Sequence, residues 1–177
     1  MTENLNLGEK LDFADIDLTA PAKVIEEILS ELPKETNGII SGKIEAYDGP
    51  VFSCMTFDVL AKTDIVGALG GKKIDIQKDL GEIGQESYKY ECFLYTPEYD
   101  KYKYRIFFVN YSISHYPVDI ILEESVAESI SSSGAYIYTC DTRSELESLV
   151  LRIFSSKRVI SVMQNLVRIN QAKRSEN

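Results

Sequence analysis

Apolar residues recur with a helical period near both ends of the chain. After Pro21 an apolar stripe repeats every three or four positions, whereas Glu26, Glu27 and Glu31 fall on the opposite side. Thr19 or Ala20 is suited to the N-cap, Pro21 is tolerated in a first turn, and Pro33 is expected to end the helix. The pattern predicts an N-terminal helix whose buried stripe consists of Val24, Ile25, Ile28, Leu29 and Leu32.

Two more helices are predicted in the last third of the chain. Thr142 and Glu145 have the spacing of a capping box, and Ser156 can cap a second helix directly after the first. Leu146, Leu149, Val150, Ile153 and Phe154 line one side of the first helix, and Val159, Val162, Met163 and Leu166 line the second. Residues 1–18 are expected to form an extended arm, residues 19–172 one domain, and residues 173–177 a polar tail.

Alternating patterns between these helices predict strands. Three of them, near Tyr88–Tyr95, Tyr102–Tyr111 and Val118–Glu123, form a meander, and residues 135–140 form another strand. Residues 38–52 are expected to form two strands around the turn Asp48-Gly49. We expect a short helix at 56–69, ended by Gly70-Gly71, and a short helix or loop at 125–135.

The order of these elements favours the α+β class. We expect a single domain in which an antiparallel sheet of about five strands packs against the N-terminal helix and the C-terminal helix pair. A length of 177 residues and a hydrophobic content of 44% are sufficient for one domain with a real core.

The net charge of −9 is unevenly distributed along the chain. Residues 1–100 contain 20 acidic and 9 basic residues, whereas residues 101–177 contain 8 acidic and 10 basic residues. The simplest interpretation of this charge is that it keeps the protein soluble, whereas the functional interpretation is that it steers association with a basic protein partner. An acidic body repels nucleic acid, so the cations of the C-terminal helices, Arg152, Lys157, Arg158, Arg168, Lys173 and Arg174, leave nucleic acid only a minor alternative. The first residues lack the basic and apolar regions of a secretory signal, and no apolar run approaches the length of a membrane span. We therefore expect a cytoplasmic protein.

The residues that usually carry chemistry are few. Cys54, Cys92 and Cys140 are widely spaced, which suits reduced thiols, and His115 is the sole imidazole in the chain. Lys72 in GALGGKK is followed by Lys73, whereas a phosphate-binding loop requires Ser or Thr there. We expect neither a metal site nor a cofactor.

Carboxylates are plentiful but do not form a recognisable pair. Asp119, Glu123 and Glu124 lie on or beside a predicted strand, yet the lysine that a metal-dependent nuclease motif needs does not follow. The simpler interpretation is that these acids protect an edge strand from aggregation. A hydrolase or nuclease that uses Asp119, Glu123 or His115 remains the alternative hypothesis.

Tyrosine is concentrated in one stretch. Eight of the 11 tyrosines lie between Tyr88 and Pro117, in strands where a flat ring suits a half-buried sheet. Exposed tyrosines at the turn between the first two meander strands would favour protein binding, because they supply contact area at low entropic cost. The candidate partner-binding residues are Glu91, Glu98, Tyr99, Asp100, Tyr102 and Tyr104.

These patterns together favour a non-enzymatic, acidic protein-binding module. An immunity protein, an antitoxin or another inhibitor that masks a basic partner is of this type. The alternatives are an enzyme of unrecognised type and a structural or accessory subunit of a phage or bacterial defence assembly.

Overall fold

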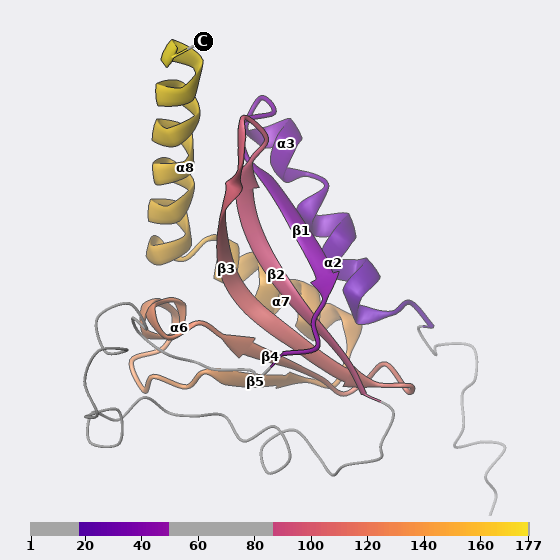
Figure 1. Cartoon of the computed structure of the whole chain (residues 1–177). Helices are drawn as coiled ribbons and strands as arrows, with labels where there is room; N and C mark the ends of the chain where they lie inside the picture. The colour runs from indigo at the N-terminus through magenta and orange to yellow at the C-terminus, as the bar shows by residue number, and fades with distance from the viewer. Residues whose placement is uncertain (1–17, 50–86, 177) are drawn as a thin grey trace, which may run out of the picture.

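A five-stranded antiparallel sheet with strand order β1-β2-β3-β4-β5 forms the centre of the computed structural model, which describes residues 18–49 and 87–176 (Figure 1). The strands are β1 (Ser41–Ala46), β2 (Ser87–Thr96), β3 (Tyr99–Ser112), β4 (Val118–Leu122) and β5 (Ile137–Cys140). The helices are α2 (Pro21–Leu29), α3 (Leu32–Glu35), α6 (Glu124–Ile130), α7 (Arg143–Phe154) and α8 (Lys157–Glu176). The predicted α+β class, with a sheet of five strands, an N-terminal helix and C-terminal helices, is confirmed.

The N-terminal helix is shorter than predicted. Ala20 is its N-cap and Pro21 its first residue, as expected, but the helix ends at Leu29. Pro33 does not end it: this proline lies in the first turn of the separate helix α3. Proline lacks a backbone N–H, but the N–H groups of a first helical turn have no partner within the helix. A proline can therefore begin a helix as readily as it ends one.

The C-terminal helix pair follows the predicted caps. The Thr142 hydroxyl accepts the N–H of Glu145 at 3.3 Å, and the Glu145 carboxylate accepts the N–H of Asp141 at 2.8 Å. Ser156 accepts the N–H of Val159 at the start of α8. The helix then continues to Glu176, through the residues expected to form a tail.

The three meander strands are paired as the sequence predicts, and each is antiparallel to its neighbour. The first strand of the hairpin predicted at residues 38–52 is β1, which pairs with β2. The second strand of that predicted hairpin and the predicted helix at 56–69 lie outside the described residues.

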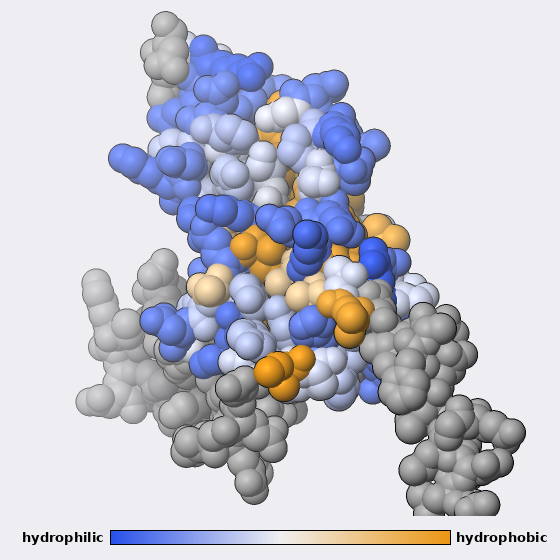
Figure 2. Space-filling view, turned by 90° about the vertical axis from the view of Figure 1, so that its right-hand side faces the viewer, coloured by the Kyte–Doolittle hydropathy of each residue, from blue (hydrophilic) through white to orange (hydrophobic). Residues whose placement is uncertain are grey.

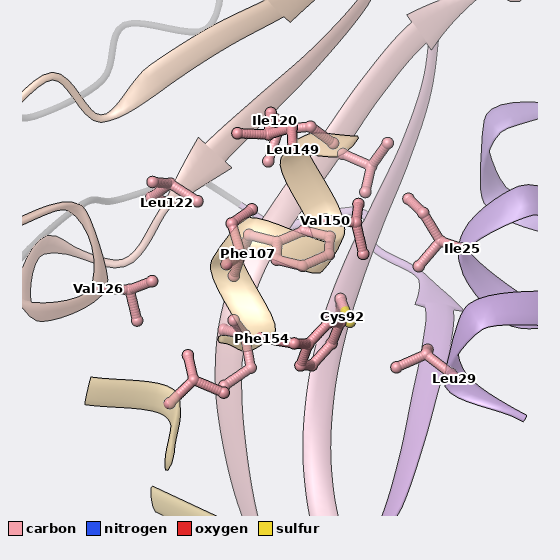
Figure 3. Close-up of a cluster of buried hydrophobic side chains, with 14 of the residues drawn as sticks. Ile25, Leu29, Cys92, Phe107, Ile120, Leu122, Val126, Leu149, Val150 and Phe154 are labelled. Carbon is pink, nitrogen blue, oxygen red and sulfur yellow. The ribbon is translucent and has the colours of Figure 1, made fainter. Parts of the chain in front are cut away.

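One face of the sheet carries the hydrophobic core. Ile25 and Leu29 of α2, Val150 and Phe154 of α7, and Val126 of α6 converge on the side chains of the central strands (Figure 3). The sheet contributes Cys92, Phe107, Ile120 and Leu122 to this cluster, among other residues. Burial of this many large apolar side chains is the main source of stability in a domain of this size.

The opposite face of the sheet has a smaller apolar cluster and many charges. Phe108 and Ile121 are buried there, and Tyr47, Tyr136 and Ile137 pack around them. An irregularity in the register between Cys92 and Phe93 shifts the pairing of β2 with β3 by one residue. Beyond this bulge Phe93 is paired with Arg105 instead of Ile106. As directly opposed residues of neighbouring strands, Phe93 and Arg105 lie on the same face of the sheet.

The side of the molecule that carries α2 and α3 is mainly hydrophilic. Figure 2 shows hydrophobic atoms there in several separate groups rather than in one continuous patch. None of the helices within residues 18–49 and 87–176 combines the length and the apolar character that crossing a bilayer requires.

Candidate functional site at the β2–β3 hairpin

The hairpin between β2 and β3 reaches the end of the sheet beside α8, at the top of Figure 1. At its base the Thr96 hydroxyl donates a hydrogen bond of 3.0 Å to Oδ1 of Asn170 on α8. Both side chains are buried, with exposed fractions of 0% and 1%. A buried polar pair of this kind is costly to separate, so the hairpin is held to the helix.

Two further contacts fasten the tip of the hairpin to the last turns of α8. The guanidinium of Arg174 lies 3.2 Å from the Glu98 carboxylate, and the Lys173 ammonium lies 5.5 Å from the centre of the Tyr99 ring. Asn170, Lys173 and Arg174 have the spacing of one helix face, which explains why they reach the same hairpin. Two of the predicted partner-binding residues, Glu98 and Tyr99, therefore also have an intramolecular role.

Tyrosine rings and a carboxylate remain accessible at this tip. The exposed fraction is 36% for Tyr99 and 41% for Tyr102, and Asp100 between them is exposed as well. We refer to Glu98, Tyr99, Asp100 and Tyr102 as the hairpin surface.

Tyr104 is placed differently from the hairpin surface. Its hydroxyl accepts a hydrogen bond of 2.8 Å from Arg158 of α8, and it lies 3.2 Å from the Ser125 hydroxyl and 3.4 Å from the Glu123 carboxylate. Ser125 in turn donates to Glu123 and accepts from Nε of Arg158 at 2.9 Å. The half-buried Tyr104 thus belongs to a polar network that joins β3, α6 and α8.

Glu91 lies on the sheet face opposite the helices. Its carboxylate is 2.7 Å from the Arg105 guanidinium, which also lies over the rings of Tyr47 and Phe108 at 5.3 and 4.6 Å. Nearby, the hydrogen bond from Lys43 lowers the pKa of the Glu45 carboxyl below its ordinary value. The charges on this face are largely paired with one another. Glu91 therefore has an intramolecular role as the ion-pair partner of Arg105, in addition to the binding role predicted for it.

The acidic character of the sequence is weak in the described part of the chain. Residues 18–49 and 87–176 contain 17 acidic and 14 basic residues, so most of the net charge of −9 belongs to segments outside them. Lys101, Lys103, Lys173 and Arg174 lie on the same hairpin and helix end as Glu98 and Asp100. The aromatic hairpin surface therefore has surroundings of mixed charge, a property that counting charges along the sequence could not give.

The residues of the alternative, catalytic hypothesis lie in separate surroundings. His115 is in the turn before β4, where its ring packs edge-on against Tyr111 at 6.0 Å. Asp119 accepts a hydrogen bond from Thr139 at 2.7 Å, and Glu123 belongs to the Tyr104 network. Within the described ranges no three His, Cys, Asp or Glu side chains are grouped as a metal ion would require.

Neither described cysteine has the properties of a nucleophile. Burial raises the pKa of the Cys92 thiol, and burial together with Glu145 raises the pKa of Cys140 to about 11. Both thiols are free and remain protonated at neutral pH, whereas a nucleophilic cysteine needs a lowered pKa.

The basic residues of the C-terminal helices are mostly occupied with acids or tyrosines of the same chain. Arg143 pairs with Glu147 and Glu27 at 2.7 and 3.3 Å, and Arg158 is held by Tyr104. A nucleic-acid-binding surface needs cations that are available to phosphate groups, and these intramolecular contacts occupy several of the cations on the C-terminal helices.

In comparisons with known proteins, no protein-family model, no curated protein and no solved structure matches the chain.

Proposed function

We propose that this protein is a non-enzymatic binding module that masks a protein partner with the hairpin surface. The type of function is that of an immunity protein, an antitoxin or another inhibitor, in which a small domain acts by occupying a surface rather than by chemistry. The proposal includes a cytoplasmic location, where Cys92 and Cys140 stay reduced as free thiols.

The observation that carries the proposal is the combination of exposed aromatic rings and a rigid support. Tyr99 and Tyr102 are accessible, while Thr96, directly before the turn, is bonded to Asn170 in the interior. A ring that is already held in place loses little conformational entropy on binding, and tyrosine is among the residues that contribute most at protein interfaces.

The electrostatic argument for a basic partner rests on the net charge of the whole chain rather than on the hairpin surface alone. A net charge of −9 produces a negative field that accelerates the approach of a basic protein. Because this field is screened by salt, the association rate should fall as the ionic strength rises, whereas the contacts of Tyr99 and Tyr102 should mainly determine the dissociation rate.

The test begins with affinity capture from the cells that make this protein, followed by titration of the purified partner. The informative variant is the double substitution Tyr99→Ser and Tyr102→Ser. Tyr88→Ser is the matched control, because Tyr88 is equally accessible, with an exposed fraction of 43%, but lies at the other end of β2.

We expect the double variant to bind the partner at least about tenfold more weakly, and the control to bind like the original protein. Equal losses in both variants, or no loss in either, would contradict the role of the hairpin surface. An association rate that does not change between low and physiological salt would contradict the electrostatic part of the proposal.

A further inference from the structure

The strand β5 is one edge of the sheet and lies at the bottom of Figure 1. Its register with β4 pairs Ile120 with Tyr138 and Val118 with Cys140, and the N–H of Leu122 donates to Tyr136. Since the hydrogen bonds of an antiparallel ladder alternate, the N–H and C=O groups of Ile137 and Thr139 point away from β4. No other described backbone group pairs with them.

A groove of about 420 Å³ runs between this edge and helix α7. Its lining consists of Tyr138, Thr139 and Cys140 of β5 and Ser144, Glu145, Ser148, Leu149 and Arg152 of α7. Ser144 and Ser148 are small and exposed, and Leu151 nearby on the same helix has an exposed fraction of 57%. An open strand edge beside a helix with small side chains has the shape that accepts a further strand.

The charges along the groove differ between its two ends. Asp141 and Glu145 lie where β5 ends and α7 begins, whereas Arg152 lies further along α7, above the Tyr138 ring at 5.5 Å. From Glu145 to Arg152 the helix rises about 10 Å. Among the described residues, Arg152 has no ion-pair partner, and its contact is with Tyr138.

This arrangement is complementary to itself under a two-fold rotation. In an antiparallel pair of β5 strands with Thr139 opposite Thr139 of the second copy, Tyr138 lies opposite Cys140 of that copy. The large ring then faces a small side chain and can enter the groove. Arg152 of each copy approaches Asp141 of the other, and both ends of the interface contain opposite charges.

We propose that two copies of this chain associate through β5, which joins their sheets into one continuous antiparallel sheet with the two α7 helices side by side. The alternative register, with Tyr138 opposite Tyr138, would bring the two Arg152 side chains together and is disfavoured by their like charge. The proposal is independent of the hairpin surface and of the function proposed for it, because β5 and the β2–β3 tip are different parts of the sheet.

The first test is sedimentation of the full chain over a wide range of concentrations. We expect a monomer–dimer equilibrium that weakens as salt is added. A monomer at every concentration would overturn the proposal.

The second test uses two charge reversals, Arg152→Glu and Asp141→Arg. Each variant alone places like charges at both ends of the interface, so we expect its dimer dissociation constant to rise by at least about tenfold. An equimolar mixture of the two variants restores opposite charges at both ends and should form a mixed dimer.

Arg168→Glu is the control, because this exposed arginine lies on α8 and contacts Asn165 of its own helix. Circular dichroism would verify that all variants are folded. Dimers that persist in both single variants, or a mixture that stays monomeric, would overturn the proposal, and neither outcome depends on a binding partner being found.

Discussion

The hydroxyl of Thr96 and the side-chain amide oxygen of Asn170 form a hydrogen bond that spans 74 positions of the sequence and is shielded from water. It joins the last residue of β2 to the C-terminal half of α8. In the interior a hydrogen bond of this kind has no competition from solvent, but loss of either partner leaves the other without compensation.

Replacing Asn170 alone should therefore cost more than replacing both partners. We expect Asn170→Leu to lower the free energy of unfolding by about 1–3 kcal/mol, because the Thr96 hydroxyl stays buried without its acceptor. Adding Thr96→Val should recover part of this loss. Urea denaturation of the two single variants and the double variant measures the coupling, and strictly additive effects would show that the bond makes no contribution of its own.

The polar network of Tyr104, Ser125, Glu123 and Arg158 should contribute to stability, because the planar guanidinium of Arg158 donates to two hydroxyls at once. Arg158→Met removes donors to Tyr104 and Ser125 and should cost about 1–2 kcal/mol. Arg158→Lys should rescue little of this, since an ammonium cannot bond two hydroxyls with the same fork. Arg168→Met is the control, and it should change the unfolding free energy by less than about 0.5 kcal/mol. Equal effects at the two arginines would contradict the structural role of the network.

Gly42 in β1 permits the close approach of α2. A Cβ atom at this position would collide with Cδ2 of Leu29 and lie 3.1 Å from Cδ1 of Leu32. We expect Gly42→Ala to destabilise the fold by about 1–3 kcal/mol because the core would be overpacked. Chemical denaturation of Gly42→Ala with and without Leu29→Ala tests this cause. If the alanine at 42 costs as much in the Leu29→Ala background, crowding against Leu29 is not the reason.

The sequence predicted the parts of this fold that depend on local pattern. The alternation of β2 and β3 and the Thr142 cap of α7 are visible in a few neighbouring residues, because pleat and capping have fixed periods and spacings. Pro33 was misinterpreted since the same residue type suits both the end and the beginning of a helix. The order of the sheet, in which β1 pairs with β2 across a long segment, depends on distant contacts that no local pattern contains.

The candidate site was predictable in part. Tyr99 and Tyr102 are accessible at a strand turn, where sequence reasoning placed them, although their binding role is still a prediction. Their contacts with α8 were missed because the residues of its last turns, Lys173 and Arg174, were expected to lie in a tail. The spacing of Asn170, Lys173 and Arg174, at positions i, i+3 and i+4, indicates that the helix continues and that the three side chains lie on one face of it. The hydrogen bond that the Tyr104 hydroxyl accepts from Arg158 could not be predicted, because the two residues are far apart in the sequence.

The buried thiol of Cys140 should make stability fall at alkaline pH. Its pKa is raised from 9.0 to about 11, with burial as the largest cause and the nearby Glu145 carboxylate as the next. Above about pH 9 the unfolded chain loses this proton while the folded chain keeps it, so the unfolded state binds fewer protons and the free energy of unfolding decreases as the pH rises. The decrease ends near pH 11, where the folded thiol also ionises, and a shift of this size corresponds to a total of about 2–3 kcal/mol.

Other groups titrate in the same range, so the measurement is a comparison between the original protein and Cys140→Ala. Alanine does not ionise, and the variant should be less stable at neutral pH because of the cavity that it leaves. Urea denaturation at intervals from pH 8 to about pH 11 should then show the two stability curves converging as the pH rises. Curves that remain parallel over this range would mean that Cys140 has the same affinity for its proton in the folded and unfolded chains, and that its burial at the end of β5 does not control its ionisation.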